Sequence, residues 1–457
     1  MIAMMQSTGP DRRTATALRL VLGLAAVALV GLPLTGLPGP ARPGVGDLVR
    51  LTVWRHDLQP AERAGFADQI RRFARSRPGI EVSVVQVPEA QYPDRMQLAA
   101  LRSELPDVVD VDGPLLANYA YQGVLAPLDG LVADRTREDL TPSTRRQGTL
   151  DGHLYGVGAI DSGLGLFASR RALQAVGARI PHSWSDAWTA QEFEAVLGRL
   201  ARRDQDGRVL DLALDYGVGE WFTYAFAPVV WSAGGTFGDP PSFSTARRTL
   251  PTPGAVEAVT RLTRWAATYA DPHGADGAAF TGGRVALSWA GHWRYRQYHA
   301  ALGDDLVVLP LPDFGHGART TSGSWAWAIA ANSRHPRESA ELLDFLLSTP
   351  EVLAASAASG GPPGTSSASL LSPAYRPGGP LALFGEALGK ACERPDDTGC
   401  VAAVRPPTPG YPTITNAFSQ ALQAVFDGVD AGQALRQAAE VIDLDAAGNG
   451  GYAPGGD

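Results

Sequence analysis

The first part of the chain changes repeatedly between two hydrophobic periods. Leu48 to Trp54 is an apolar run, Ile80 to Val87 alternates, and Pro106 to Asp112 is again mainly apolar, so these segments predict three strands. A helix beginning at Pro60 and another between the second and third strands are predicted from apolar residues at helical spacing. This order predicts parallel strands covered by helices on both faces.

The same alternation returns near the middle of the chain. Val285 to Trp289, Leu306 to Leu309 and Ala326 to Ala331 predict strands, and His335 to Leu347 predicts a helix. Helices dominate from Arg170 to Tyr269, and two more follow near the carboxyl end of the chain. The pattern is typical of an α/β protein whose sheets are mixed and mostly parallel.

Composition extends this interpretation to a large, acidic protein. The 457 residues are 45% hydrophobic and 19% charged, which is enough to form the cores of two lobes. The formal net charge is -8, and no dense basic stripe is visible, which argues against a nucleic-acid surface. Neutral or weakly charged partners are therefore expected.

Residues 1–46 are predicted to lie outside the fold. Arg12, Arg13 and Arg19 precede an apolar run from Leu20 to Leu32, and a Pro/Gly-rich linker follows. This is the pattern of an export signal, although the run can also remain as an N-terminal anchor. Either interpretation places the protein outside the cytoplasm, as a secreted or periplasmic protein or one tethered to the outer face of the membrane.

Several motifs occur in a recognisable order. A Gly-Gly-Arg-Val-Ala-Leu strand ends in Trp, a Gly-Ser-Trp strand follows, and a Ser-Arg-His-Pro segment opens a helix. Further along, Arg-Pro-Pro-Thr-Pro-Gly-Tyr-Pro precedes the last two helices. From Leu48 to Ile442 the chain resembles the family-1 extracellular solute-binding proteins, which capture sugars for ABC importers and include maltose- and trehalose/maltose-binding proteins.

The resemblance implies a two-lobed periplasmic-binding-protein-like fold of type II, with a ligand cleft between the lobes. The N-terminal lobe is expected to comprise 47–157 and 303–358, and the C-terminal lobe 158–302 and 359–445. The chain would then cross between lobes near Tyr155 to Asp161, near Leu302 and near Ser359. Residues 446–457 are expected to form a disordered tail.

Candidate ligand-binding residues come from sugar chemistry and from motif position. Sugars present flat apolar faces and rims of hydroxyls, so a site needs indole platforms with carboxylates, amides or a guanidinium around them. A Trp taken at random is more often an ordinary core residue, and an exposed Asp is often only a loop carboxylate. With those alternatives left open, the predicted site consists of Asp112, Asp161, Trp293, Trp325, Arg405, Trp289, Trp231, His56, Gly323 and Ser324.

The resemblance implies a binding protein and not an enzyme. It would capture a disaccharide or oligosaccharide by lobe closure and deliver it to the membrane permease subunits of an ABC importer. A monomer without cofactor, metal or nucleic acid is expected. The alternative is an exported carbohydrate-active hydrolase with a Trp-lined cleft, which would need two carboxylates about 5 to 9.5 Å apart around a glycosidic bond.

The two cysteines predict a local cross-link. Cys392 and Cys400 enclose a short polar loop, and in an exported protein such a pair is most simply a disulfide, because two thiols are too few for a structural zinc site. The loop is expected to be peripheral to binding. Many Gram-positive relatives carry a lipidated Cys just after the apolar run, and none is present here, so a lipid anchor is not expected.

Overall fold

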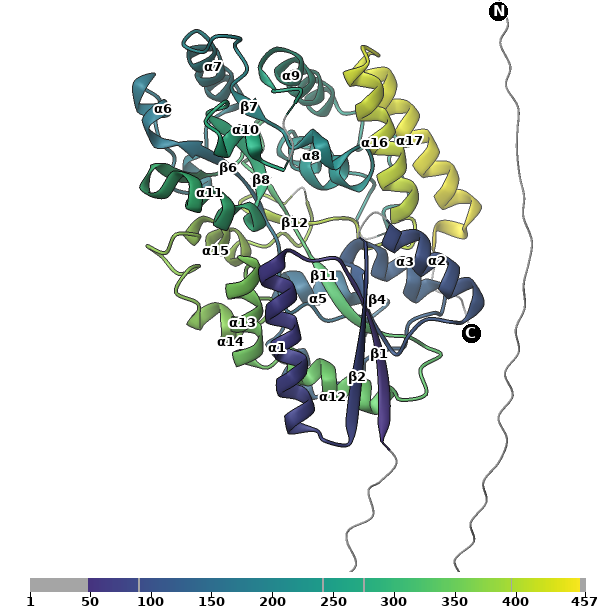
Figure 1. Cartoon of the computed structure of the whole chain (residues 1–457). Coiled ribbons are helices and arrows are strands. Elements are labelled where there is room, and N and C mark those ends of the chain that lie inside the picture. Colours follow the sequence, from purple (N-terminus) through teal and green to yellow (C-terminus); the bar gives the residue numbers. More distant parts are fainter. Residues whose placement is uncertain (1–47, 89–90, 241, 274–275, 396, 453–457) are drawn as a thin grey trace, which may run out of the picture. The chain divides into compact units, whose positions relative to one another are not determined.

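Two four-stranded sheets organise the chain in the computed structural model. The structure describes residues 48–88, 91–240, 242–273, 276–395 and 397–452 (Figure 1). The N-terminal segment predicted to direct export lies outside the described residues. Among those residues, no helix combines the length and apolar character needed to cross a membrane.

The first sheet contains the three strands predicted at the start of the chain. Its order is β11-β3-β1-β2, in which β1 pairs in parallel with β2 and β3, and β11 is an antiparallel edge. Its strands are β1 (Val49–His56), β2 (Ile80–Val87), β3 (Val108–Asp112) and β11 (Trp325–Ile329). The predicted parallel arrangement is confirmed here.

Helices cover this sheet and define, with it, the first lobe. The sequence signals are local: α1 begins with Pro60 at its first turn and has a capping box between Gln59 and Glu62. Phe66 and Phe73 then lie on its buried face. The helices of the first lobe are α1 (Pro60–Ser76), α2 (Tyr92–Arg102), α3 (Leu116–Tyr121), α4 (Asp134–Asp139), α5 (Pro142–Gly148), α12 (Pro336–Leu346), α13 (Thr349–Ser359) and α14 (Ser366–Leu371).

The second sheet has the order β7-β8-β6-β9 and differs from the predicted pattern. Both neighbours of β6 are antiparallel to it, and only the short β7 pairs in parallel with β8. The expectation of a mostly parallel sheet is therefore wrong for this half of the chain. The strands are β6 (Leu164–Ser169), β7 (Leu210–Asp211), β8 (Leu287–Gly291) and β9 (Leu306–Leu309).

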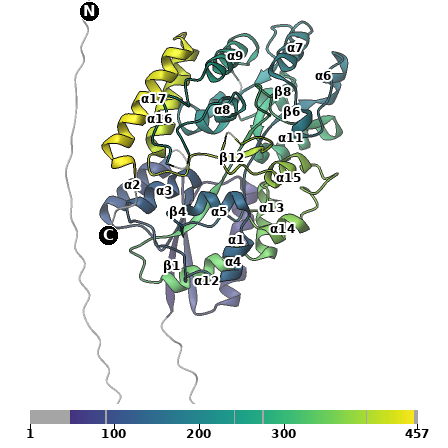
Figure 2. The same cartoon turned by 180° about the vertical axis from the view of Figure 1, so that it is seen from behind.

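The second lobe consists of this sheet, its helices and the largest hydrophobic core of the described residues. Helix α8 is buried along nearly its whole length, and α16 and α17 run side by side in both views (Figures 1 and 2). The helices are α6 (Arg170–Ala175), α7 (Ala190–Ala201), α8 (Glu220–Ser232), α9 (Pro253–Tyr269), α10 (Ala278–Thr281), α11 (Tyr295–Leu302), α15 (Ala382–Gly389), α16 (Tyr411–Phe426) and α17 (Ala431–Gly448).

Two predicted boundaries need correction. The chain does not cross between lobes near Leu302, because β9 follows and pairs with β6 of the second sheet from Leu166 to Ser169. The crossing comes after β9. The tail expected to be disordered from residue 446 continues as α17 to Gly448 and then as a short 3₁₀ turn, Gly450–Tyr452.

Three crossings join the lobes and contact one another. The first leads to β6, and the second leads from β9 to β11. The third runs from α13 to α15 and includes α14, which packs on α13 and bonds to Asp139 of the first lobe. The chain therefore leaves the first lobe after α14, and not near Ser359 as expected. Asp161 in the first crossing donates its backbone N–H to the Pro362 carbonyl in the third, at 2.7 Å. The second crossing contains β10 (Thr320–Ser322), which pairs in parallel with β12 (Ala402–Val404). A small antiparallel pair, β4 (Thr149–Leu150) and β5 (His153–Leu154), precedes the first crossing.

His292, just after β8, is buried beside the third crossing. Its side chain is 4% exposed, and its ring meets Trp293 and Phe384 edge-on, with centroids 5.2 and 6.4 Å apart. A Cβ added at Gly361 would lie 3.1 Å from a carbon of this ring. Burial lowers the pKa of His292 to about 3, because the charged imidazolium would lose its hydration.

This histidine should make folding stability depend on pH. Between about pH 6.5 and pH 3 the unfolded state binds a proton that the native state excludes, so the free energy of unfolding falls as pH falls, by up to about 1.36 kcal/mol per pH unit. Denaturation by urea at pH 7, 6 and 5 measures this slope. His292→Gln should flatten it, whereas the control His299→Gln, on exposed surface of α11, should not. An unchanged slope in His292→Gln would contradict the assignment.

Candidate functional site

Arg405 lies at the centre of a charged cluster that draws together both lobes. It directly follows β12, and its side chain is only 4% exposed. Its Nη1 and Nη2 donate to the two carboxylate oxygens of Asp112 at 3.0 and 2.9 Å, a bidentate pair. Nη1 also donates to Glu220 Oε1 at 2.5 Å, and Nη2 donates to the Gly323 carbonyl at 3.2 Å.

The two carboxylates come from the ends of regular elements. Asp112 is the last residue of β3 in the first lobe, and Glu220 is the first residue of α8 in the second. A negative charge is favourable at a helix N-terminus. Glu220 also accepts hydrogen bonds from the hydroxyls of Tyr411, at 2.5 Å, and Thr415, at 2.8 Å, which fix its side chain beside the guanidinium.

The electrostatics of this cluster keep Arg405 charged. Burial alone would lower the pKa of its guanidinium, but the charges of Asp112 and Glu220 oppose burial and raise it well above its ordinary value. The ring of Tyr224 lies 4.9 Å from the guanidinium carbon and adds a cation–π contact. The cluster therefore holds one positive and two negative side chains.

Trp325 provides a partly exposed indole in the first lobe. It follows Ser324 at the start of β11, and its ring stacks on His56 at 3.7 Å between centroids, with 14° between the planes. The ring of Tyr92 meets the same indole edge-on at 5.3 Å. His56 is oriented by a 2.7 Å contact between its Nδ1 and Oδ2 of Asp110. These neighbours fix the plane of the indole.

Trp293 is the corresponding partly exposed indole in the second lobe. Its Nε1 donates to the Tyr216 hydroxyl at 3.0 Å. The rings of Trp221 and Tyr224 lie 6.3 and 5.9 Å away. Because Tyr224 also contacts the guanidinium of Arg405, Trp293 is connected to the charged cluster through one aromatic ring.

Gly323 and Asp161 form a joint between two crossings. Gly323 has a φ of 91°, and its N–H donates to Asp161 Oδ1 at 2.7 Å. The hydroxyl of Ser162 donates to the Gly323 carbonyl at 2.8 Å, and the amide of Gln147 donates to the Ser324 carbonyl at 2.6 Å. The backbone of the predicted Gly-Ser pair is therefore used to hold the crossings together.

Three predicted site residues are fully buried and present no surface to a ligand in this structure. Asp161 is 0% exposed, and burial raises the pKa of its carboxyl group, against the hydrogen bonds from Gly323 and Ser162. Trp231, at 0%, packs edge-on against Phe237, and Trp289, at 1%, donates its indole N–H to a backbone carbonyl of α8. In this structure the three side chains have structural contacts, and their contact with a ligand stays a prediction.

The remaining predictions fall around the charged cluster, and the structure adds residues that the sequence reasoning missed. Asp112, Gly323 and Arg405 are in direct contact, and Ser324 and Trp325 follow in the chain. The missed residues are Glu220, Tyr216, Trp221 and Tyr224. One signal was available, because Glu220 is a lone acid immediately before a strongly apolar run of the sequence. Within the described ranges, no group of His, Cys, Asp and Glu could hold a metal ion.

The α/β fold with two sheets, each with its own helices and core, is that of the two-lobed solute-binding proteins. Residues 68–377 match the model of the family described as bacterial extracellular solute-binding protein. The match covers more than half of the chain, and the chain belongs to this family.

Several solved structures share the fold over nearly their whole length. The cyclic alpha-maltosyl-1,6-maltose binding protein from Arthrobacter globiformis has a TM-score of 0.70 and 23% identity, covering 87% of this chain and 98% of its own. The GacH receptor of Streptomyces glaucescens, solved unliganded and with acarbose, has a TM-score of 0.70 and 21% identity over 88% and 98%. A Listeria monocytogenes ABC substrate-binding protein in complex with cycloalternan reaches 0.73 with 17% identity over 88% and 100%.

A curated relative matches a shorter region. An uncharacterized lipoprotein in the oleD 5′ region of Streptomyces antibioticus is 29% identical over 185 residues. The match spans 40% of this chain and 39% of that protein.

The joint at Gly323 generates a stability prediction. An added Cβ at Gly323 would lie 2.0 Å from Gln147 Oε1, whereas one at Gly123, which also has a positive φ, would meet nothing within 4 Å. Gly323→Ala should therefore lower the free energy of unfolding by about 1–2 kcal/mol for the left-handed backbone and by roughly 1 kcal/mol more for displacing Gln147. Gly123→Ala should lower it by the backbone contribution alone. Chemical denaturation measures both, and equal losses would contradict the role of Gly323.

Proposed function

We propose that this protein captures a neutral sugar, a disaccharide or oligosaccharide, outside the cytoplasm and delivers it to the permease of an ABC importer. The observation that carries the proposal is the cluster of Arg405, Asp112 and Glu220 with two partly exposed indoles connected to it. Trp325 pairs with Asp112 in the sheet, and Trp293 contacts Tyr224, whose ring lies beside Arg405. A guanidinium and carboxylates hydrogen-bond hydroxyls, and indole faces pack on the apolar faces of sugar rings.

The charge of the cluster favours a neutral ligand. One cation and two carboxylates leave one net negative charge, which disfavours sugar acids and phosphates. The solved structures with the same fold include complexes with acarbose, cycloalternan and maltotriose, and these ligands are neutral or basic saccharides. The family's extracellular setting supports export, with the N-terminal segment as signal or anchor.

Binding without turnover is proposed over hydrolysis, although one feature favours the hydrolase. Burial raises the pKa of Glu220, as a general acid requires, against the opposing charge of Arg405. However, Glu220 already accepts bonds from Arg405, Tyr411 and Thr415, and Asp112 is paired with both Nη atoms of the same guanidinium. These bonds engage both carboxylates in holding Arg405, whereas a hydrolase needs one of them to protonate the glycosidic oxygen.

A thermal-shift panel tests the proposal. Maltose, maltotriose, acarbose and mannotriose should include a stabilising ligand, whereas galacturonic acid should not stabilise the protein. A sugar present at 100 times its dissociation constant should add about 2.7 kcal/mol to the free energy of unfolding. Failure of all neutral saccharides, together with a clear shift from an amino acid or oligopeptide, would redirect the assignment.

Two Trp variants and one chemical assay sharpen the same test. Trp325→Ala should weaken binding of the stabilising sugar roughly tenfold, because the sugar ring loses the indole face on which it stacks. Trp54→Ala is the matched control, since Trp54 is also partly exposed in the first lobe but lies over Arg95. Release of reducing ends from maltotriose, abolished in Glu220→Gln, would establish the hydrolase instead.

Closure of the lobes is the proposed mechanism of capture. A ligand that contacts Asp112 in the first lobe and Trp293 in the second favours the state in which both are near, by the difference in contact free energy. Small-angle scattering should therefore show a smaller radius of gyration with the stabilising sugar than without it. Identical curves at saturating sugar would leave binding intact and remove closure as its mechanism.

A further inference from the structure

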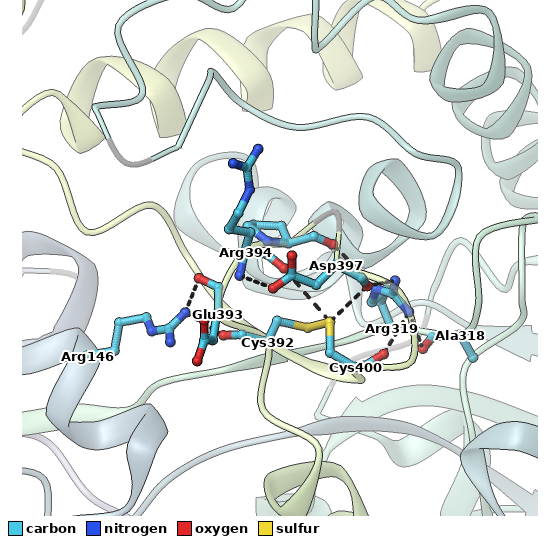
Figure 3. Close-up of a disulfide and its surroundings, with 9 residues drawn as sticks. Arg146, Ala318, Arg319, Cys392, Glu393, Arg394, Asp397 and Cys400 are labelled. Atoms are coloured by element: carbon cyan, nitrogen blue, oxygen red, sulfur yellow. Dashed lines mark hydrogen bonds between the residues drawn. A yellow bond between two sulfur atoms is a disulfide. The ribbon is translucent and has the colours of Figure 1, made fainter.

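The disulfide loop encloses the side chain of Arg319, which is only 2% exposed (Figure 3). Cys392 and Cys400 are joined, as the sequence predicts. Nη1 of Arg319 donates to the Cys400 carbonyl at 2.7 Å, and Nη2 donates to the Asp397 carbonyl at 2.8 Å. Nε donates to the Pro395 carbonyl at 3.4 Å. We call these carbonyls of the 392–400 loop, with the guanidinium they hold, the loop cage.

Backbone bonds hold the two ends of the loop near β12. The N–H of Cys392 donates to the Ala402 carbonyl, and the N–H of Val401 donates to the Lys390 carbonyl, both at 2.7 Å. On the other side of the loop, Arg146 from α5 donates to the Cys392 carbonyl at 2.5 Å and to that of Glu393 (Figure 3). Helix α5 itself lies beside β12 (Figure 2). The loop is thus fixed from both sides.

The loop cage stands at the start of both strands that lead to the candidate site. Arg319 immediately precedes β10, and Cys400 lies two residues before β12. The strands pair in parallel, and the N–H of Thr320 donates to the Val401 carbonyl at 2.9 Å. The residues that follow the two strands are Gly323 and Arg405, which are themselves hydrogen-bonded.

A buried guanidinium makes this arrangement sensitive to the loop. Removing a cation from water is costly unless its N–H groups are hydrogen-bonded, so the loop carbonyls that converge on Arg319 help to keep it buried. Reduction of the disulfide frees the loop to sample other conformations, and each of them breaks part of the cage. The start of β10 then loses its side-chain attachment beside the start of β12 and is held there by the backbone pairing.

We propose that Arg319 and the Cys392–Cys400 loop form a positioning unit that sets Gly323 and Arg405 in the candidate site, so that solute affinity depends on the disulfide. This replaces the expectation that the loop is peripheral to binding. The affinity part rests on the proposed function, whereas the effect on β10 and β12 does not. Arg319 is a positioning residue, because it contacts the loop and not the site.

The test combines amide hydrogen exchange with sugar binding on the full chain. In ligand-free protein, Arg319→Met and reduction by a phosphine should each speed exchange at the amides of β10 and β12 roughly tenfold, the loss expected for a hydrogen bond to a charged group. Each should also weaken binding of maltotriose, or of whichever panel saccharide stabilises the protein, by about the same factor. Reduction of Arg319→Met should have no larger effect on exchange or affinity than either change alone, because both break the same cage.

Two further variants separate positioning from a general loss of stability. Arg319→Lys keeps the charge but loses the planar set of N–H donors that reaches several carbonyls at once. Its sugar affinity should therefore lie between those of Arg319→Met and the wild type. Arg146→Met removes the bonds on the other side of the loop but keeps the disulfide and Arg319, so it should change both measurements less than Arg319→Met does. If Arg319→Met does not fold, the reduced wild-type protein carries the test.

The possible failures are distinguishable. If the amides of β10 and β12 exchange as slowly in the reduced protein and in Arg319→Met as in the oxidised wild type, the loop cage does not position these strands. Faster exchange with unchanged sugar affinity would overturn its link to the site. If no saccharide binds even the oxidised wild-type protein, the proposed function fails, and the exchange measurement still decides whether the cage orders the two strands.

Discussion

The buried guanidinium of Arg405 is the interaction on which the candidate site depends. Its cation is held by a carboxylate from each lobe, and neither carboxylate would be stable so close to the other without it. Loss of one partner from a buried ion pair leaves the other uncompensated, which is far more costly than the pair itself. Asp112, Glu220 and Arg405 therefore act as one unit, although they are distant in the sequence.

The residues around this unit are ordered by backbone as much as by side chains. Gly323 contributes its N–H to Asp161 and its carbonyl to Arg405 and Ser162, so a residue without a side chain connects the joint to the charged cluster. Arg319 performs a similar task through carbonyls of the disulfide loop. The geometry of the site is thus determined largely by segments that present no side chain to a ligand.

Much of the first lobe could be predicted because its signals are local. Alternation from Ile80 to Val87 and the apolar face of α1 directly specify a strand and a helix, and their order implies parallel pairing. The crossing after β9 could not be located, because antiparallel pairing of β9 with β6 is a tertiary choice that a short apolar run does not encode. Individual Trp residues pose the same difficulty. Trp289 and Trp325 are both predicted at strand ends, but β8 continues to Gly291, and Trp289 lies enclosed in its middle.

The bonds among the crossings have a mechanical consequence. Asp161 is attached through its side chain to Gly323 in the second crossing and through its N–H to Pro362 in the third. Rotation about any one crossing should therefore strain its bonds to the others, so we expect the three segments to move together. Substitutions in the bonded crossings would then change the balance between open and closed lobes without touching the ligand site, which makes the crossings a place to engineer a sensor.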